Sequence, residues 1–181
     1  MDIKSLVKIT SRAWSLDILA LLDSGVAGRQ APLLAATEAN RTAFAKSLSH
    51  LIDLGLLQRN PGHGHPLRPE YRLTATGIEI ARVAGNLVRA VPSDAEFAPL
   101  RRCWTLPILS VTAAPRRFTE IKTDLLSVSD RALSQSLGQL QEINWLQREV
   151  DSAVRPPRPT YQAASIGLTL CQTVNGGSAI N

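Results

Sequence analysis

Residues 129–149 alternate hydrophobic and polar positions with the period of a helix. Leu133, Leu137 and Leu140 share one face, which predicts an amphipathic helix packed against a core. The opposite face carries Arg131, Ser134, Gln135 and Gly138. It contains no acidic residue. The sequence that follows predicts a short strand at 144–148 and an extended, basic, proline-rich hairpin that ends at Tyr161.

The preceding sequence falls into similar elements. Helical patterns cover residues 2–22, 30–37, 41–54 and 77–91, and strands are expected at 56–59 and 70–74 around a turn cluster at 60–66. Asn40 is a suitable N-cap for the third helix, and Gly55 suits the left-handed residue that ends it. Residues 92–99 begin and end with proline and are expected to be a linker.

The same order of patterns occurs twice at a nearly constant offset. Residues 12–19 match 102–109, the leucines of 48–57 match apolar residues of 137–146, and residues 66–71 match 156–161. Matches spread over a whole module indicate an internal repeat. Gly55 aligns with Asn144, and both residue types tolerate the left-handed conformation of a helix C-terminus.

The repeated residues resemble a known family. The pattern R-x-W-[ST]-L-x-I-L opens both copies, and the second copy continues with R-R-F-T-E-I at 116–121 and S-D-R-A-L-S-Q-S-L at 129–137. These motifs resemble the HxlR-type winged helix-turn-helix transcriptional regulators. The first copy is more divergent, because residues 30–37 lack the R-F-x-E-L pattern. Arg12-Ala13 and Arg102-Cys103 also stand where the family has Gly-Lys.

The resemblance implies a mostly α protein with small β-hairpins (α+β), built from tandem winged helix-turn-helix domains that bind DNA and regulate genes. The expected organisation is a divergent first domain at 1–91, a linker at 92–99, a better-preserved second domain at 100–175 and a disordered tail at 176–181. Family members usually carry one domain and act as homodimers on inverted repeats. Two domains in one chain would then form a covalent pseudo-dimer, with a homodimer of whole chains as the alternative.

Composition narrows the class of function. The 181 residues carry a net charge of +5, which suits a polyanionic partner, and aromatic residues at 4% disfavour a single-strand binder that stacks bases. No apolar run reaches the length of a membrane span, and charges interrupt the first 20 residues, which disfavours a signal peptide. Two cysteines suggest a reduced, cytoplasmic protein. The resemblance to DNA-binding regulators implies that it is associated with the nucleoid. The sequence contains no glycine-rich phosphate loop and no plausible nucleophile–base pair, so neither an enzyme nor a bound cofactor is expected.

The candidate DNA contacts follow from the recognition helices and the wings of the two copies. In the second copy they are Arg116, Arg117, Ser129, Arg131, Ser134, Gln135, Gly138, Arg155 and Arg158. In the first copy they are Arg41, Thr42, Lys46, Ser49, His63, His65 and Arg68. Arginine can pair with guanine and glutamine with adenine, so Arg131 and Gln135 are expected to read bases. The other basic residues are expected to hold phosphates.

Each of these predicted roles has a simpler alternative. Each helix face could be ordinary solvated surface, and His63 and His65 are a weak basis for a metal site, so none is expected. Cys103 is a candidate for redox chemistry, with a structural thiol as the commoner alternative. The alternative function is one winged helix on DNA and the other on a protein, such as RNA polymerase or a co-regulator.

Overall fold

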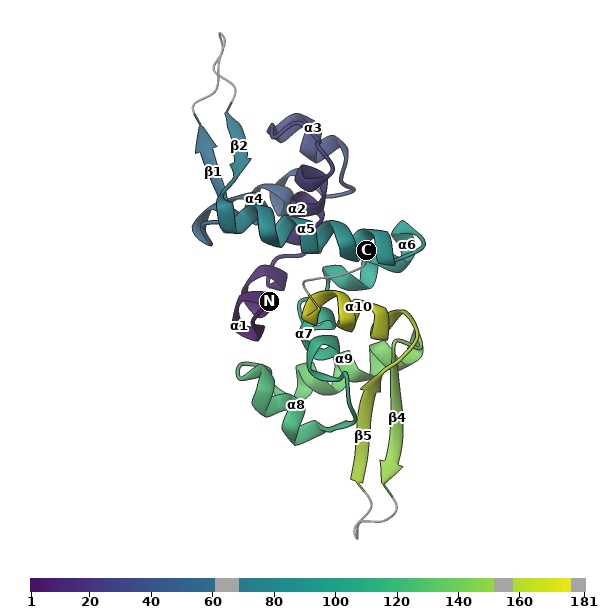
Figure 1. Ribbon diagram of the computed structural model, residues 1–181. Helices are drawn as coiled ribbons and strands as arrows, with labels where there is room; N and C mark the ends of the chain where they lie inside the picture. The colour runs from purple at the N-terminus through teal and green to yellow at the C-terminus, as the bar shows by residue number, and fades with distance from the viewer. Residues whose placement is uncertain (61–68, 152–157, 177–181) are drawn as a thin grey trace. The chain divides into compact units, whose positions relative to one another are not determined.

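The computed structural model describes residues 1–60, 69–151 and 158–176 (Figure 1). Contacts divide the chain into two compact units. We call Ile9–Arg89 the N-unit, and Met1–Lys8 together with Ala90–Asn181 the C-unit. The expected domain boundaries differ from this division at the N-terminus. Helix α1 (Ile3–Thr10) begins in the C-unit, where the N-terminal ammonium donates to the backbone oxygen of Val174 at 3.4 Å.

The N-unit continues with short helices, a hairpin and a long last helix. These are α2 (Ser15–Asp23), α3 (Gln30–Ala35), α4 (Arg41–Asp53), β1 (Leu57–Asn60), β2 (Glu70–Leu73) and α5 (Ala75–Ala90). Strands β1 and β2 are antiparallel and project beyond α4 (Figure 1). The helix expected over 2–22 is divided into α1 and α2, because the chain turns where Ser15 donates its backbone N–H to the oxygen of Arg12 at 3.2 Å.

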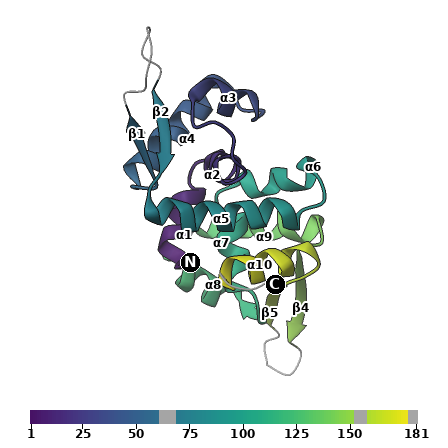
Figure 2. The same ribbon diagram turned by 45° about the horizontal axis from the view of Figure 1, so that its top comes forward.

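The C-unit has a similar order of three helices, two hairpin strands and a last helix, with short additional elements. It contains α6 (Asp94–Phe97), a 3-10 helix at Ala98–Arg101, α7 (Thr105–Val111), β3 (Arg116–Arg117), α8 (Phe118–Leu125), α9 (Asp130–Glu142), β4 (Leu146–Asp151), β5 (Arg158–Ala163) and α10 (Ile166–Asn175). The expected linker at 92–99 therefore holds a helical turn, and burial of Phe97 and Leu100 explains why this segment is ordered. The tail expected at 176–181 lies outside the described residues from position 177 onward. Figure 2 shows the hairpin of each unit from a second direction.

The cores of the two units use equivalent residues. Phe44, Leu48 and Leu51 of α4 are buried, as are Leu133, Leu137 and Leu140 of α9. Most of the hydrophobic stabilisation of a helix in a small domain comes from burying such a stripe. The mostly helical chain with small antiparallel sheets confirms the predicted α+β winged-helix class.

Local geometry also agrees between the units. The predicted left-handed residues are present, with φ of 69° at Gly55 and 56° at Asn144. Trp14 and Trp104 precede α2 and α7 with the same φ of −99°. A Cβ on Gly77 would overlap the backbone oxygen of Leu56, and glycine is required for this close approach. Gly167 meets the backbone oxygen of Trp145 in the same way.

Candidate nucleic-acid interface

Helix α9 exposes a polar face. Ser129 precedes the helix, and its Oγ accepts a hydrogen bond from the backbone N of Ala132 at 3.3 Å, which fixes the first turn. The residues predicted to lie opposite the buried leucines are accessible. Gly138 is half-buried, and the other four are exposed: Ser129, Arg131, Ser134 and Gln135. This face is therefore free of core packing and can meet a partner.

An acid lies beside this face. Asp130, in the first turn of α9, is paired with Lys122 of α8, whose Nζ lies 2.6 Å from Oδ1. Both side chains are largely exposed, so the pair contributes little to stability. Its effect is to neutralise the carboxylate next to Arg131, which leaves the guanidinium as the unbalanced charge on this turn.

The three-stranded sheet of the C-unit has the order β3-β5-β4. Tyr161 on the central strand is paired in register with Arg116 on β3 and with Arg148 on β4. Residues directly opposite one another on antiparallel strands lie on the same face, so the two arginines flank the tyrosine. Further along the same face, Leu146 pairs with Ala163, and both are buried. The wing thus presents a row Arg116–Tyr161–Arg148 just beyond the core.

Arg148 is a basic residue of the wing that the sequence did not predict as a DNA contact. It is exposed on β4, two residues after the buried Leu146. The two-residue period of a strand places both on one face, and this was the signal available in the sequence. The pairing with Tyr161, however, depends on the register of the hairpin.

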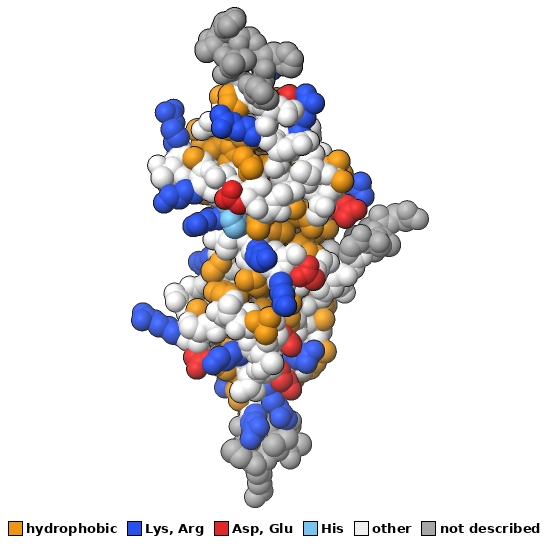
Figure 3. Space-filling view, turned by 90° about the vertical axis from the view of Figure 1, so that its left-hand side faces the viewer, with side chains coloured by type: hydrophobic (Ala, Val, Ile, Leu, Met, Phe, Trp, Pro, Cys, Tyr) orange, Lys and Arg blue, Asp and Glu red, His pale blue; other side chains and the backbone are white. Residues whose placement is uncertain are grey.

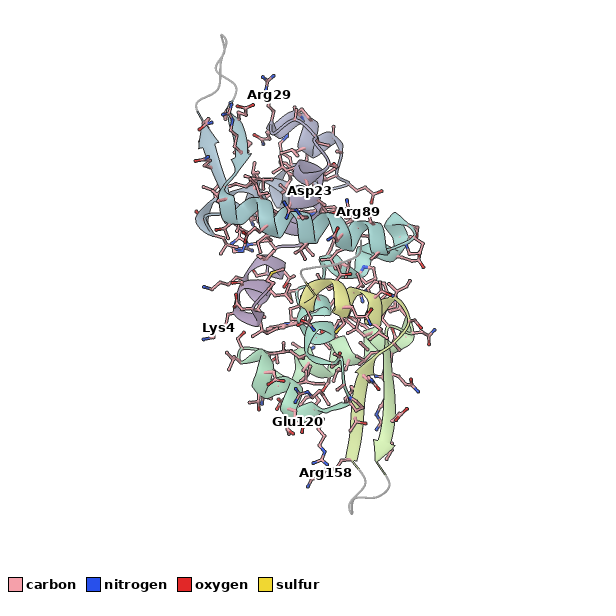
Figure 4. The ribbon with its side chains drawn as sticks, in the orientation of Figure 1. Lys4, Asp23, Arg29, Arg89, Glu120 and Arg158 are labelled. Atoms are coloured by element: carbon pink, nitrogen blue, oxygen red, sulfur yellow. The ribbon has the colours of Figure 1, made fainter. Side chains whose placement is uncertain are left out.

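The start of α8 is already occupied by a carboxylate. Arg117 precedes the helix, and its backbone N–H donates to Oε2 of Glu120 at 2.7 Å. Glu120 therefore takes one of the unpaired donors that a phosphate would use at a helix N-terminus. Any phosphate contact here rests on the side chains of Arg116, which is exposed, and Arg117, which is half-buried. Figure 4 labels Glu120 and also Arg158, whose side chain extends from the outer end of β5.

A recognition-type helix capped by serine and followed by a basic antiparallel wing is the arrangement of winged helix-turn-helix proteins. Residues 100–176 match the HxlR-like helix-turn-helix family. This family consists of transcriptional regulators rather than enzymes, and the match supports a DNA-binding transcriptional regulator. No curated protein matches the chain.

A solved structure also resembles part of the chain. It is described as a MarR-family transcriptional regulator from Porphyromonas gingivalis W83, with 20% sequence identity and a TM-score of 0.42. The similarity covers 47% of this chain and 83% of the other.

The HxlR-like segment contains every contact residue predicted for the second copy. Arg155 falls within the matched range but outside the described residues. In the described part of the chain, no helix is long and apolar enough to cross a membrane. The same residues contain no group of three or more His, Cys, Asp or Glu side chains arranged for a metal ion.

Outside the HxlR-like segment, α4 occupies the position in the N-unit that α9 has in the C-unit. The Asn40 side chain accepts from the backbone N of Ala43 at 2.8 Å and caps α4 as predicted. The four predicted contact residues on this helix are all exposed: Arg41, Thr42, Lys46 and Ser49. The space-filling view shows exposed Lys and Arg side chains on the described surface of each unit (Figure 3).

The wing of the N-unit is reduced. Among residues 1–60 and 69–89 its sheet has two strands, and the place of β3 is taken by a bridge between Arg29 and Glu70. Arg59 pairs with Tyr71 as Arg148 pairs with Tyr161, so an arginine–tyrosine pair occurs in each wing. Arg29 points outward from the start of α3 (Figure 4). His63, His65 and Arg68 lie outside the described residues.

Cys103 lies just before α7 and is exposed, whereas Cys171 on α10 is buried. No disulfide joins them. Partial burial raises the pKa of the Cys103 thiol above its ordinary value, and hydrogen bonds from the backbone oppose this shift only in part. A raised pKa lowers the thiolate fraction, and the thiolate is the reactive form. The redox role considered for Cys103 stays a prediction.

Proposed function

We propose that the protein is a sequence-specific regulator that binds double-stranded DNA through the recognition helices and wings of both units. In this proposal Arg131 and Gln135 of α9 contact base edges in the major groove, where arginine reads guanine and glutamine reads adenine. The basic residues Arg116, Arg117, Arg155, Arg158 and Lys46 hold phosphates and fix the register on the duplex.

The single observation that carries the proposal is the exposed polar face of α9. The leucines on the other side of α9 are buried, and Ser129 caps the helix. The neighbouring Asp130 is paired with Lys122, so Arg131 is the unbalanced cation among neutral hydrogen-bonding groups on this face. Such a face fits a groove that offers acceptors and negative charge. The HxlR-like match over the same residues supports the same conclusion.

The second part of the proposal is that the two units are copies of one module and act as a pseudo-dimer within one chain. The repeated order of elements, the paired left-handed residues and the paired glycine contacts support a duplication. Two peptide connections, at Lys8–Ile9 and at Arg89–Ala90, join the units. Tethering keeps one unit at high effective concentration when the other is bound, so two half-sites can be occupied without a second chain.

A second candidate is a division of labour in which the N-unit contacts a protein, such as RNA polymerase or a co-regulator. The observation that favours it is the reduced wing of the N-unit, whose described residues lack the third strand and its adjacent pair of arginines. Asp53, exposed near the end of α4, also opposes a phosphate backbone.

The proposal is tested by selecting bound duplexes from a random DNA pool and measuring the stoichiometry of the complex with the best sequence. The pseudo-dimer predicts two half-sites protected by one chain, with sequence preference relaxed at one position of a half-site when Arg131 is changed to alanine. Two chains on two half-sites would contradict the pseudo-dimer and leave DNA binding intact. Failure to enrich any duplex sequence would contradict sequence-specific binding itself.

A further inference from the structure

A shallow pocket of about 270 Å³ lies on the surface of the N-unit beside α4. Its lining consists of Arg12, Lys46, Ser49, His50 and Asp53. The four residues of α4 are spaced so that they share one helix face, and Arg12 reaches them from the turn before α2. The pocket therefore brings together a guanidinium, an ammonium, an imidazole and a hydroxyl from two separate segments.

A hydrogen bond holds the two segments together. Ser11 Oγ lies 3.1 Å from Nε2 of His50, so the residue next to Arg12 is tied to the last turn of α4. The backbone is fixed on the other side of Arg12 as well, because its oxygen accepts from the N–H of Ser15 at 3.2 Å. The backbone at Arg12 is thus held beside α4 on both sides, which leaves only the side chain to be ordered when a ligand binds.

The charges in the pocket favour an anion. Arg12 and Lys46 are cationic. Among the described residues, the lining contains one acidic side chain, that of Asp53 at the far end of the helix face. Arginine and lysine both bind phosphate oxygens, arginine through its planar pair of donors and lysine as a point charge. Ser49 adds a hydroxyl that can donate to a phosphate oxygen, while His50, whose Nε2 lies against Ser11, completes the lining. These are the groups that one phosphate, with several acceptor oxygens, needs around it.

The corresponding face of the C-unit has different chemistry. At the same offset, Lys46, Ser49 and His50 are replaced by Gln135, Gly138 and Gln139. The equivalent of Lys46 is therefore uncharged and suited to reading a base edge, and the equivalent of Ser49 has no side chain. The two helices thus differ at positions that line the pocket.

We infer that the Arg12–Lys46–His50 pocket of the N-unit binds a single phosphate group. The group is supplied by the backbone of a DNA duplex or by a free phosphate ion or phosphomonoester. The first source rests on the proposed DNA-binding function, in which case α4 anchors the chain on the backbone while α9 reads sequence. The second source does not depend on that function.

The first test uses the full chain without DNA, labelled with ¹⁵N, and inorganic phosphate as the probe. Sodium phosphate is titrated at fixed pH against sodium chloride of equal ionic strength. A bound phosphate produces saturating shifts at the amides of Arg12, Lys46 and Ser49 that chloride does not produce. Lys46→Gln weakens these shifts several-fold, whereas Asp53→Asn strengthens them by removing the opposing charge.

The matched control is Arg82→Gln, which removes the same charge from an exposed position on α5 outside the pocket. It leaves phosphate binding unchanged if the pocket acts as a site, and weakens it as much as Lys46→Gln if only net charge matters. All three substitutions are at exposed residues, and thermal unfolding confirms that each variant is folded.

The second test measures affinity for the selected duplex over a range of salt concentrations. The slope of log K against log salt is negative, and loss of one phosphate contact reduces its magnitude by about 0.9. Lys46→Gln reduces the magnitude by this amount without changing sequence preference if DNA supplies the phosphate, and Arg82→Gln does not. Saturating phosphate shifts with an unchanged DNA slope identify a free phosphate as the ligand.

The inference is overturned if phosphate and chloride give the same shifts and Lys46→Gln has the same salt slope as Arg82→Gln. It is also overturned if the two variants weaken phosphate binding equally. Should the wild-type chain bind no duplex at all, the proposed function fails, while the phosphate titration still decides whether the pocket is a site.

Discussion

Helices α4 and α9 have the same architecture and different surfaces. Each has 13 residues, each is capped by a side-chain oxygen that accepts from the third backbone N–H, and each is followed by a left-handed residue. Their buried faces are equivalent, yet α4 carries the exposed Lys46 and the half-buried His50 where α9 carries Gln135 and Gln139. The core fixes the position of the helix, and the exposed face is left to change with little cost in stability.

The two wings differ in the same sense. The C-unit adds β3 to its hairpin and so places Arg116 beside Tyr161, whereas the N-unit retains a bridge at Arg29. Gly28 lies where that arginine would be, and a Cβ there would overlap the backbone oxygen of Tyr71. The close approach of the two backbones leaves no room for a side chain at Gly28. The described part of the N-unit wing therefore has fewer positive groups, because the backbone at Gly28 lies too close to Tyr71 for an arginine.

The largest effect is expected from the cores, where the two units should behave alike. Leu48 and Leu137 are both buried, and truncation of either to alanine should cost about 2–5 kcal/mol in the free energy of unfolding. Urea denaturation followed by tryptophan fluorescence measures this for both variants. A cost well under 1 kcal/mol for one of them would show that the helices are not equivalently packed.

The next effect separates the two surfaces. Arg131→Ala should cost about 1–3 kcal/mol of DNA affinity and relax sequence preference at one position. Lys46→Ala should weaken binding similarly on all sequences, because a phosphate contact carries no sequence information. Competition binding with a panel of singly mutated duplexes gives both results. An equal change in sequence preference for the two variants would mean that α4 reads bases as α9 does.

A smaller effect compares the helix ends. Gly55→Ala should destabilise the N-unit by about 1 kcal/mol, since an L-residue with a Cβ is disfavoured at a φ of 69°. Asn144→Gly should be neutral or stabilising by a few tenths of a kcal/mol, because it relieves the same strain. Thermal unfolding of both variants measures the difference. A stabilising Gly55→Ala would be inconsistent with the left-handed geometry.

The smallest effect concerns Cys103, which precedes Trp104 in the C-unit as Ala13 precedes Trp14 in the N-unit. Its pKa is raised above the ordinary thiol value by burial, so the folded state favours the neutral thiol. Any stability linked to this thiol is complete below the pKa of an unfolded cysteine and is lost as pH rises through the folded value. Iodoacetamide should therefore alkylate Cys103 more slowly than free cysteine between about pH 8 and 9.

Cys103→Ser is the control for this reaction, because the remaining thiol of Cys171 is buried. Alkylation faster than that of free cysteine, together with loss of DNA affinity after mild oxidation, would support a redox role for Cys103.

Local sequence was sufficient for much of the fold. The leucine spacing of α9, the caps at Asn40 and Ser129, and the left-handed residues Gly55 and Asn144 were all predicted and are present. Each depends on residues within a turn or two of one another, so the side-chain pattern alone encodes it. The exposure of Arg131 and Gln135 follows from the same pattern.

Other features were decided only by the tertiary structure. The packing of Met1–Lys8 with the C-unit, the row Arg116–Tyr161–Arg148 and the pocket that joins Arg12 to α4 all bring together residues far apart in sequence. The burial of Phe97 within the helical turn of the expected linker also depends on residues outside that segment. Strand register, and not the period within one strand, sets which side chains become neighbours. The sequence by itself therefore determined the helices and their exposed faces, while long-range packing decided which of those faces became a wing row and which a pocket.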